Sequence, residues 1–166
     1  MNLIGHKAPL FDAPAYTSDQ KHSSVSLETL KGKWVLLFFY PLDFTFVCPT
    51  ELKELQAQIE DFKKLNCEVL SVSVDSTYSH EAWCNSSLGK LDFTMVSDIT
   101  KRMSRDYGVL DETSGLSLRG TYIIDPEGDV QYSLIHNMKI GRNISEILRT
   151  LAALQTGEAC LAQWKR

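Results

Sequence analysis

A cysteine placed between a buried strand and a helix is the residue of this 166-residue chain best suited to chemistry. Cys48 follows a dense apolar run over residues 34–40 and precedes an amphipathic segment, so we expect a helix to begin just past it. At such a position the free backbone N–H groups and the positive end of the helix dipole favour a thiolate over a thiol. An ionised cysteine is a nucleophile.

Two residues of the same loop, Pro41 and Thr45, suggest what kind of substrate Cys48 attacks. Pro41 fixes the backbone just after the strand and offers no donor, and Thr45 places a hydroxyl three residues from the sulfur. Simpler interpretations remain open: Cys48 as an inert buried cysteine, and Pro41 and Thr45 as ordinary turn residues. For Pro41 and Thr45 the turn and the chemical functions are compatible.

The elements that position Cys48 follow an α/β pattern. Residues 34–40 are apolar at every position, which is typical of a strand covered on both faces, and apolar residues recur at helical spacing over 49–65. A second strand over 67–74 completes a right-handed crossover with parallel pairing. The Cys48 loop then lies at the carboxyl end of the first strand, where open α/β sheets usually place their sites.

The remaining segments carry their own start and stop signals. Ser26 can cap a brief helix that Gly32 ends, and Asn143 with Glu146 forms a capping box for the last helix. The other expected elements are a strand over 11–16, a helix over 78–87, a strand over 93–96, a helix over 101–107, a loop over 111–117, and hairpin strands over 121–124 and 130–136.

Composition bounds the function classes. With 43% hydrophobic residues, residues 1–166 are expected to form a single domain with a full core. The net charge of −4 gives no basic footprint for nucleic acid or for an anionic membrane, and the longest apolar run is too short to cross a bilayer. The N-terminus lacks a basic flank followed by a long apolar segment, so we expect a cytoplasmic protein.

The block FFYPLDFTFVCPTEL, with its Pro-x-x-x-Thr-x-x-Cys spacing, resembles the peroxiredoxins. It is most similar to the typical two-cysteine branch, the thiol-specific antioxidants and alkyl hydroperoxide reductase component C. The similarity runs from about Ser24 to Trp164 and implies a thioredoxin-like α/β fold, a central mixed sheet flanked by helices with an N-terminal extension. It also implies a thiol peroxidase that reduces hydrogen peroxide and organic hydroperoxides without metal, haem or flavin.

The resemblance assigns roles to particular residues. Thr45 and nearby backbone N–H groups would orient the peroxide, Pro41 would shield the sulfur, and Arg119 would reach it with a cation that is always charged. Glu51 and Arg142 match a charged network behind the active site. By themselves, Arg119 and Arg142 would more often be solvated or salt-bridged, and Glu51 would serve the helix dipole.

Four cysteines occur, at positions 48, 67, 84 and 160, without a Cys-x-x-Cys pair, which argues against a zinc site and a thioredoxin-like disulfide reductase. The segment GEACLAQW resembles the family's resolving segment, so Cys160, in a tail over residues 155–166, would form a disulfide with oxidised Cys48. The resemblance implies a disulfide between subunits, whereas the sequence itself leaves an intrachain bridge open. Cys67 is expected to be buried filler. Cys84 shares a helix face with His80, but two ligands do not make a metal site.

The segment also departs from the family pattern. Leu161 stands where proline is usual, and the link to Cys160 is short. The chain as given ends at Arg166 without a Tyr-Phe tail helix, and Asn85–Lys90 replaces the Gly-Gly-Leu-Gly loop of sensitive members. We therefore expect a site that unwinds easily and a Cys48 that overoxidises slowly.

Partners follow from the same resemblance. The electron donor would be thioredoxin or a flavoprotein disulfide reductase. The strand over 130–136 is expected at a sheet edge, where it would pair with a second copy, and five dimers commonly close into a ring. The alternative functions are a redox sensor and a ring-forming holdase chaperone.

Overall fold

A seven-stranded mixed sheet organises the chain, in the order β2-β1-β5-β4-β3-β8-β9. The computed structural model describes residues 2–166. The strands of the sheet are β1 (Asp12–Tyr16), β2 (His22–Ser26), β3 (Trp34–Phe39), β4 (Cys67–Ser73), β5 (Thr94–Ser97), β8 (Arg119–Ile124) and β9 (Val130–His136). A separate small hairpin pairs β6 (Leu110–Asp111) with β7 (Leu116–Ser117).

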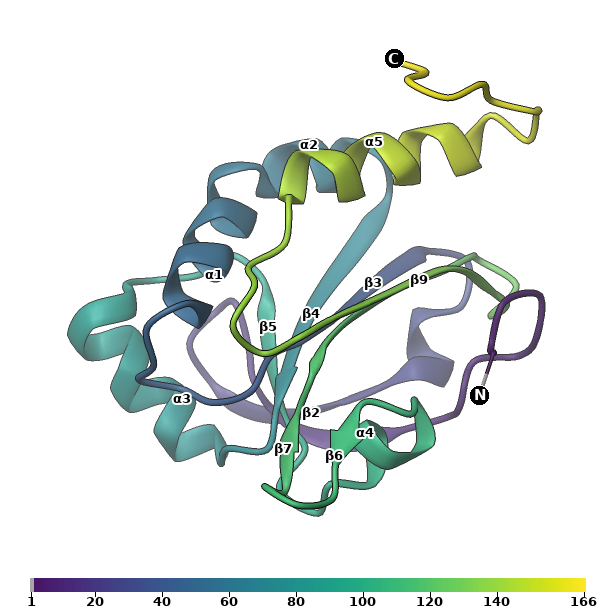
Figure 1. Cartoon of the computed structure of the whole chain (residues 1–166). Helices are drawn as coiled ribbons and strands as arrows, with labels where there is room; N and C mark the ends of the chain where they lie inside the picture. Colours follow the sequence, from purple (N-terminus) through teal and green to yellow (C-terminus); the bar gives the residue numbers. More distant parts are fainter. Residues whose placement is uncertain (1) are drawn as a thin grey trace.

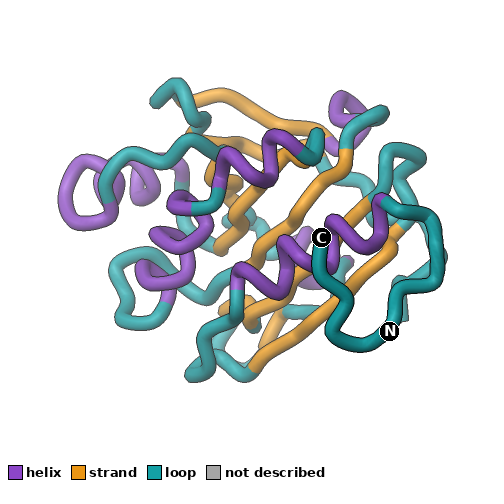
Figure 2. Tube along the Cα trace, turned by 90° about the horizontal axis from the view of Figure 1, so that it is seen from above, coloured by secondary structure: helices purple, strands orange, loops and turns teal. Residues whose placement is uncertain are grey.

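Helices cover both faces of this sheet (Figures 1 and 2). Their bounds are η1 (Leu27–Leu30, a 3-10 turn), α1 (Cys48–Ala57), α2 (Ile59–Lys64), α3 (Thr77–Trp83), η2 (Cys84–Leu88, a π-helical turn), α4 (Arg102–Asp106) and α5 (Ile144–Gln155). Figure 1 shows α1, α2 and α5 on one side of the sheet and α4 on the other. This arrangement confirms the predicted mixed sheet flanked by helices.

Strand β3 lies inside the sheet between β4 and β8 and divides the core in two, because successive side chains of a strand point to opposite faces. Leu36 and Phe38 pack under α1 and α5, whereas Leu37 and Phe39 pack on the face covered by α4. β3 pairs parallel with β4 and antiparallel with β8. The expected crossover and the burial of β3 on both faces are therefore confirmed, and the end of β3 leads directly into the Cys48 loop.

Several predicted elements differ in detail near the N-terminus and in the loops. β2 was not predicted, because its sequence His-Ser-Ser-Val-Ser lacks apolar alternation; pairing with β1 holds it as an edge strand. Ser26 does not cap the next turn with its side chain; instead its carbonyl accepts the Thr29 hydroxyl at 2.8 Å. The predicted loop over 111–117 contains most of the β6–β7 hairpin.

The helices also depart from the prediction. The single helix expected over 49–65 is divided at Gln58, whose φ of −106° and ψ of 8° lie outside the helical range, and its side chain bonds to Ser145 on α5 at 3.1 Å. Both halves still face one core. Asn143 caps α5 by accepting the Glu146 N–H at 3.0 Å, as predicted, but the Glu146 carboxylate pairs with Arg149 and does not return to Asn143.

No helix within residues 2–166 is both long enough and apolar enough to cross a membrane.

Candidate active site

Cys48 is the first residue of α1, one position earlier than expected, and Pro49 follows it in the first turn. Proline suits this turn because its missing N–H would have no partner within the helix. The Cys48 side chain is fully buried in the core that also contains Tyr40 and Leu52. A buried thiol at a helix start has the positive end of the helix dipole beside it.

Arg119 supplies a full positive charge to the same sulfur. It is the first residue of β8, whereas the sequence predicted that this strand would begin at Thr121. Its Nη1 lies 3.4 Å from Cys48 Sγ, and its Nε donates to the Met138 carbonyl at 2.7 Å, which fixes the plane of the guanidinium. The predicted contact between Arg119 and the candidate nucleophile is thus present in the structure.

Glu51 lies one helical turn after Cys48 and binds both arginines of the predicted network. Its carboxylate accepts from Arg119 Nη1 at 2.6 Å and from three nitrogens of Arg142, the amide at 2.8 Å, Nε at 2.9 Å and Nη2 at 3.0 Å. Arg142 Nη1 also donates to the Gly120 carbonyl at 2.8 Å, and its guanidinium stacks 3.3 Å from the centroid of the Phe38 ring. Arg142 is therefore buried, and the solvated position considered for it from the sequence is wrong. Glu51 is an ion-pair partner of both arginines.

The charges of this network do not cancel. Two buried guanidiniums share one buried carboxylate, which leaves one net positive charge beside Cys48. Desolvation lowers the pKa of Arg142, and the bond with Glu51 opposes that shift. Because an uncompensated buried charge is costly, a thiolate on Cys48 would complete the local charge balance.

The other two predicted loop residues lie differently. Pro41 is buried, two residues after the end of β3, and its proposed shielding role stays a prediction. Thr45 is exposed, and its hydroxyl donates to the Leu42 carbonyl at 2.8 Å, as an ordinary turn hydroxyl does. The lone pairs of that oxygen stay available to accept a hydrogen bond.

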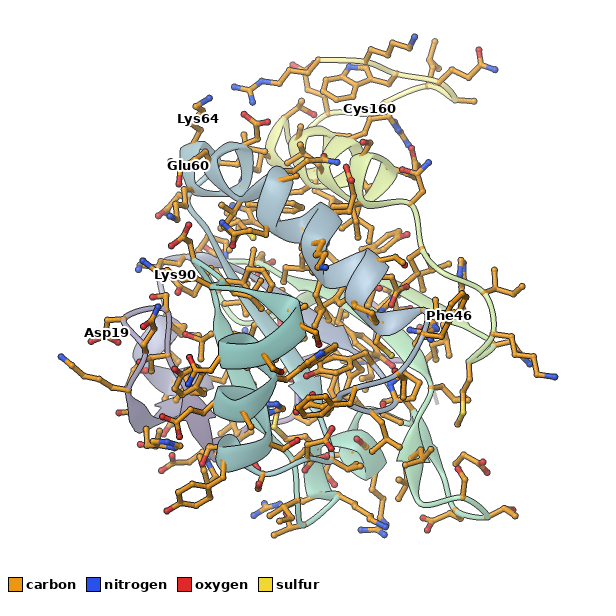
Figure 3. All side chains as sticks on the ribbon, turned by 90° about the vertical axis from the view of Figure 1, so that its left-hand side faces the viewer. Asp19, Phe46, Glu60, Lys64, Lys90 and Cys160 are labelled. Atoms are coloured by element: carbon orange, nitrogen blue, oxygen red, sulfur yellow. The ribbon has the colours of Figure 1, made fainter. Side chains whose placement is uncertain are left out.

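Cys160 lies apart from Cys48 in this chain. Helix α5 includes Gln155, so the tail begins at Thr156, one residue later than predicted. The Cys160 sulfur lies 3.8 Å from the Ala153 carbonyl and 3.5 Å from the Thr156 hydroxyl, at the C-terminal end of α5. Figure 3 shows Cys160 beside this end, away from Phe46, which precedes the start of α1.

A buried polar cluster beneath the loop was missed in the sequence. The Asp43 carboxylate accepts the Tyr40 hydroxyl at 2.6 Å and the Ser79 hydroxyl at 2.9 Å, and lies 2.7 Å from His80 Nδ1. The Asp43 N–H donates to the Asp75 carboxylate at 2.9 Å. Asp43 and His80 lie 37 positions apart, so no local motif links them.

His80 and Cys84, the pair considered as metal ligands, both have protein partners. His80 Nε2 lies 3.2 Å from the Val96 carbonyl, so both ring nitrogens have protein partners, and Cys84 Sγ contacts Met95 Sδ at 3.5 Å. Among residues 2–166, no three His, Cys, Asp or Glu side chains gather into a possible metal site. Cys67 is buried, as predicted, and burial raises the pKa of its thiol.

Comparison with known proteins places this geometry in a family. Residues 4–133 match the model of the AhpC/TSA family. The chain is 48% identical over 168 residues to a putative peroxiredoxin in the rubredoxin operon of Clostridium pasteurianum, covering 98% of this chain and 94% of that one. It is 46% identical to the mitochondrial thioredoxin-dependent peroxide reductase of Mus musculus, covering 97% of this chain and 66% of that one.

The fold agrees with a solved structure of the same kind. The reduced 2-Cys peroxiredoxin of Plasmodium vivax superposes with a TM-score of 0.96 at 42% identity, covering 99% of this chain and 90% of that one. The family model, the relatives and the superposition agree on one family. The chain therefore belongs to the AhpC/TSA family, the two-cysteine peroxiredoxins.

Proposed function

We propose that this peroxiredoxin reduces hydroperoxides with Cys48 as the reacting thiol and Cys160 as the thiol that resolves it. The observation that carries the assignment is the 3.4 Å contact between Arg119 Nη1 and the buried Cys48 sulfur at the start of α1. A thiolate so placed is a nucleophile with a cation fixed beside its point of attack.

In the first step the Cys48 sulfur attacks one oxygen of the peroxide. An S–O bond forms and the O–O bond breaks; the leaving oxygen carries the electron pair and takes a proton, giving water or an alcohol and a sulfenic acid on Cys48. Arg119 stabilises the charge that develops on the leaving oxygen. Thr45 accepts a hydrogen bond from the peroxide O–H while its own hydroxyl stays on Leu42, and Pro41 keeps water from the sulfur.

In the second step the partner subunit's Cys160 resolves the sulfenic acid. Within one chain, Cys48 adjoins the N-terminal end of α5 through Glu51 and Arg142, and Cys160 lies against Ala153 in its last turn. Nine residue steps separate Ile144 from Ala153, roughly 14 Å of helix, whereas a disulfide needs Cα atoms about 4.4–6.8 Å apart. An intersubunit bridge avoids this separation, and it also requires the first turn of α1 to unwind.

The decisive experiment compares peroxide consumption by the wild type and by Cys48→Ser with a catalytic reductant. Consumption that depends on Cys48 supports the assignment. Negligible turnover in the wild type would favour the alternatives, a redox sensor or a holdase. Non-reducing electrophoresis after one equivalent of peroxide, with Cys160→Ser alongside, should give a dimeric band in the wild type alone.

For the electron donor we favour a thioredoxin-type dithiol over a flavoprotein disulfide reductase, because the Mus musculus relative is named as thioredoxin-dependent. Assaying each donor with the oxidised protein decides between them. A thiol that must be reduced to react suits a reducing compartment, so we infer a cytoplasmic location.

Assembly follows from the exposed surfaces. β9 lies at the edge of the sheet with Ile135 exposed, and an unpaired edge invites pairing with a second copy. Phe44 and Phe46 are exposed next to the active site, Phe46 at 92%, and supply an apolar contact through which dimers would close a decamer. Sedimentation of the reduced and oxidised protein tests the dimer and the decamer. Unwinding near Phe44 and Phe46 on oxidation should loosen the contact between dimers.

A further inference from the structure

The tail that carries Cys160 is fastened at both ends. At its start, Gly157 adopts a φ of +69° and its N–H bonds to the Leu154 carbonyl, which ends α5. At its far end, Trp164 packs against the core cluster that contains Ile147 and Leu151 of α5, and the Trp164 carbonyl accepts from Arg149 Nη1 at 3.0 Å. Figure 1 shows the tail running back over α5.

Arg149 is held in a geometry that suits this contact. Its Nε and Nη2 both bond to the Glu146 carboxylate at 2.7 Å, one turn earlier in α5. This two-point pairing fixes the plane of the guanidinium and leaves Nη1 directed at the tail. The pKa of Arg149 is raised, first by Glu146 and, to a smaller extent, by the nearby Cys160.

The middle of the tail is loosely held in comparison. Leu161 is 83% exposed, and the Cys160 sulfur lies near the Ala153 carbonyl and the Thr156 hydroxyl. Five residue steps separate Cys160 from Gln155, the last residue of α5, a reach of about 17 Å when fully extended. While Trp164 stays on Arg149, the segment is a closed loop and cannot use that reach.

We propose that Arg149 is a positioning residue that anchors the resolving tail, so that its release from Trp164 sets the rate at which Cys160 resolves the sulfenic acid. This proposal rests on the function proposed above. In the step concerned, the Cys160 sulfur attacks the Cys48 sulfur of the partner subunit, an S–S bond forms and the S–O bond breaks. Hydroxide leaves and takes the Cys160 proton as water.

The test uses reduced, full-length protein and one equivalent of hydrogen peroxide. Arg149→Met keeps the apolar stem and removes the donors. Disulfide formation should become about fivefold faster, less than the roughly tenfold of the weakest buried charge-assisted bonds, because the side chain is 31% exposed. The rate of sulfenic acid formation should stay unchanged. Arg149→Lys, which cannot pair with Glu146 and Trp164 together, should fall between Arg149→Met and the wild type.

A second variant and a matched control make the result decisive. Trp164→Ala removes the ring packing but keeps the carbonyl that Arg149 holds, so it should also speed disulfide formation, and the double variant should be faster than either single one. Arg105→Met removes an exposed arginine that pairs with Glu112 at 3.2 Å, away from the tail, and should leave both rates unchanged.

Unchanged or slower disulfide formation in Arg149→Met would overturn the role of Arg149, whatever the result for Trp164→Ala. A wild type that forms no disulfide, or one whose disulfide persists in Cys160→Ser, would instead overturn the proposed function. The two failures are therefore distinguishable.

Discussion

Replacing Glu51 by glutamine tests the network behind the active site most directly. The side chain keeps its shape, but the two buried guanidiniums of Arg119 and Arg142 lose their shared carboxylate. One of the two oxygens that now accept at 2.6–3.0 Å becomes an NH₂ group facing an arginine donor. The change leaves buried positive charge without its partner.

The expected loss of stability is large. Removing one partner of a buried ion pair costs about 3–5 kcal/mol. With an m-value of about 2 kcal/mol/M, the urea midpoint of the reduced protein should fall by roughly 1.5–2.5 M at fixed protomer concentration. Glu112→Gln is the control: its exposed pair with Arg105 at 3.2 Å should contribute less than about 1 kcal/mol.

The expected loss of activity separates orientation from charge. Arg119 Nη1 is held at the Cys48 sulfur partly by Glu51, so the rate with hydrogen peroxide should fall at least about tenfold, or 1.4 kcal/mol. Alkylation of Cys48 by iodoacetamide requires a thiolate and access to the buried sulfur but no cation at a leaving oxygen, so it should stay within about threefold of the wild type. Stopped-flow kinetics and mass spectrometry of the Cys48 peptide measure the two rates. Wild-type stability together with a wild-type peroxide rate would refute the reasoning.

Three further outcomes are expected. Arg119→Lys should slow the peroxide reaction about tenfold to hundredfold, because one ammonium cannot replace the fork that holds the Met138 carbonyl, the carboxylate and the sulfur; an unchanged stopped-flow rate would count against it. Burial raises the pKa of Cys84 to about 11, so about one thiol in three thousand is ionised at pH 7.5 and iodoacetamide labelling should rise about tenfold per pH unit; equal labelling at pH 7.5 and 9.5 would contradict this. Cys48 should overoxidise slowly, and sulfinic acid seen by intact mass at a modest peroxide excess would disprove it.

The sequence predicts the central strand and the first helix because their apolar patterns are strong. It does not predict β2, whose polar residues become a strand only through pairing with β1. Nor does it place the break at Gln58, since the apolar spacing continues through it and the bond to Ser145 comes from a distant helix. Local patterns therefore specify the core elements, and tertiary pairing decides the rest.

In the candidate site, too, local patterns identify single residues but not the contacts between distant ones. Cys48 and Arg119 lie 71 positions apart and Glu51 and Arg142 lie 91 apart, so periodicity alone cannot join them; the resemblance to a known motif did. The Asp43 cluster has no such motif and was missed. Thr45 shows the opposite case, where the motif is present and the hydroxyl forms an ordinary turn bond with Leu42.

In the disulfide step proposed above, Cys48 leaves its buried position for another subunit, and two polar clusters flank the segment that moves in that step. Asp43 is fixed upstream by Tyr40 and His80, and Glu51 is fixed downstream by two arginines.

Between these fixed points the bonds are largely local. The Thr45 hydroxyl bonds to Leu42 and the Thr50 hydroxyl to Val47, while Phe44 holds a strained φ of +57°. Releasing residues 44–50 therefore breaks few bonds to other elements, and local opening is cheapest where such bonds are few. The buried clusters at either end confine the unwinding to the turn that carries the sulfur, so the sheet and the rest of α1 keep their packing while Cys48 moves.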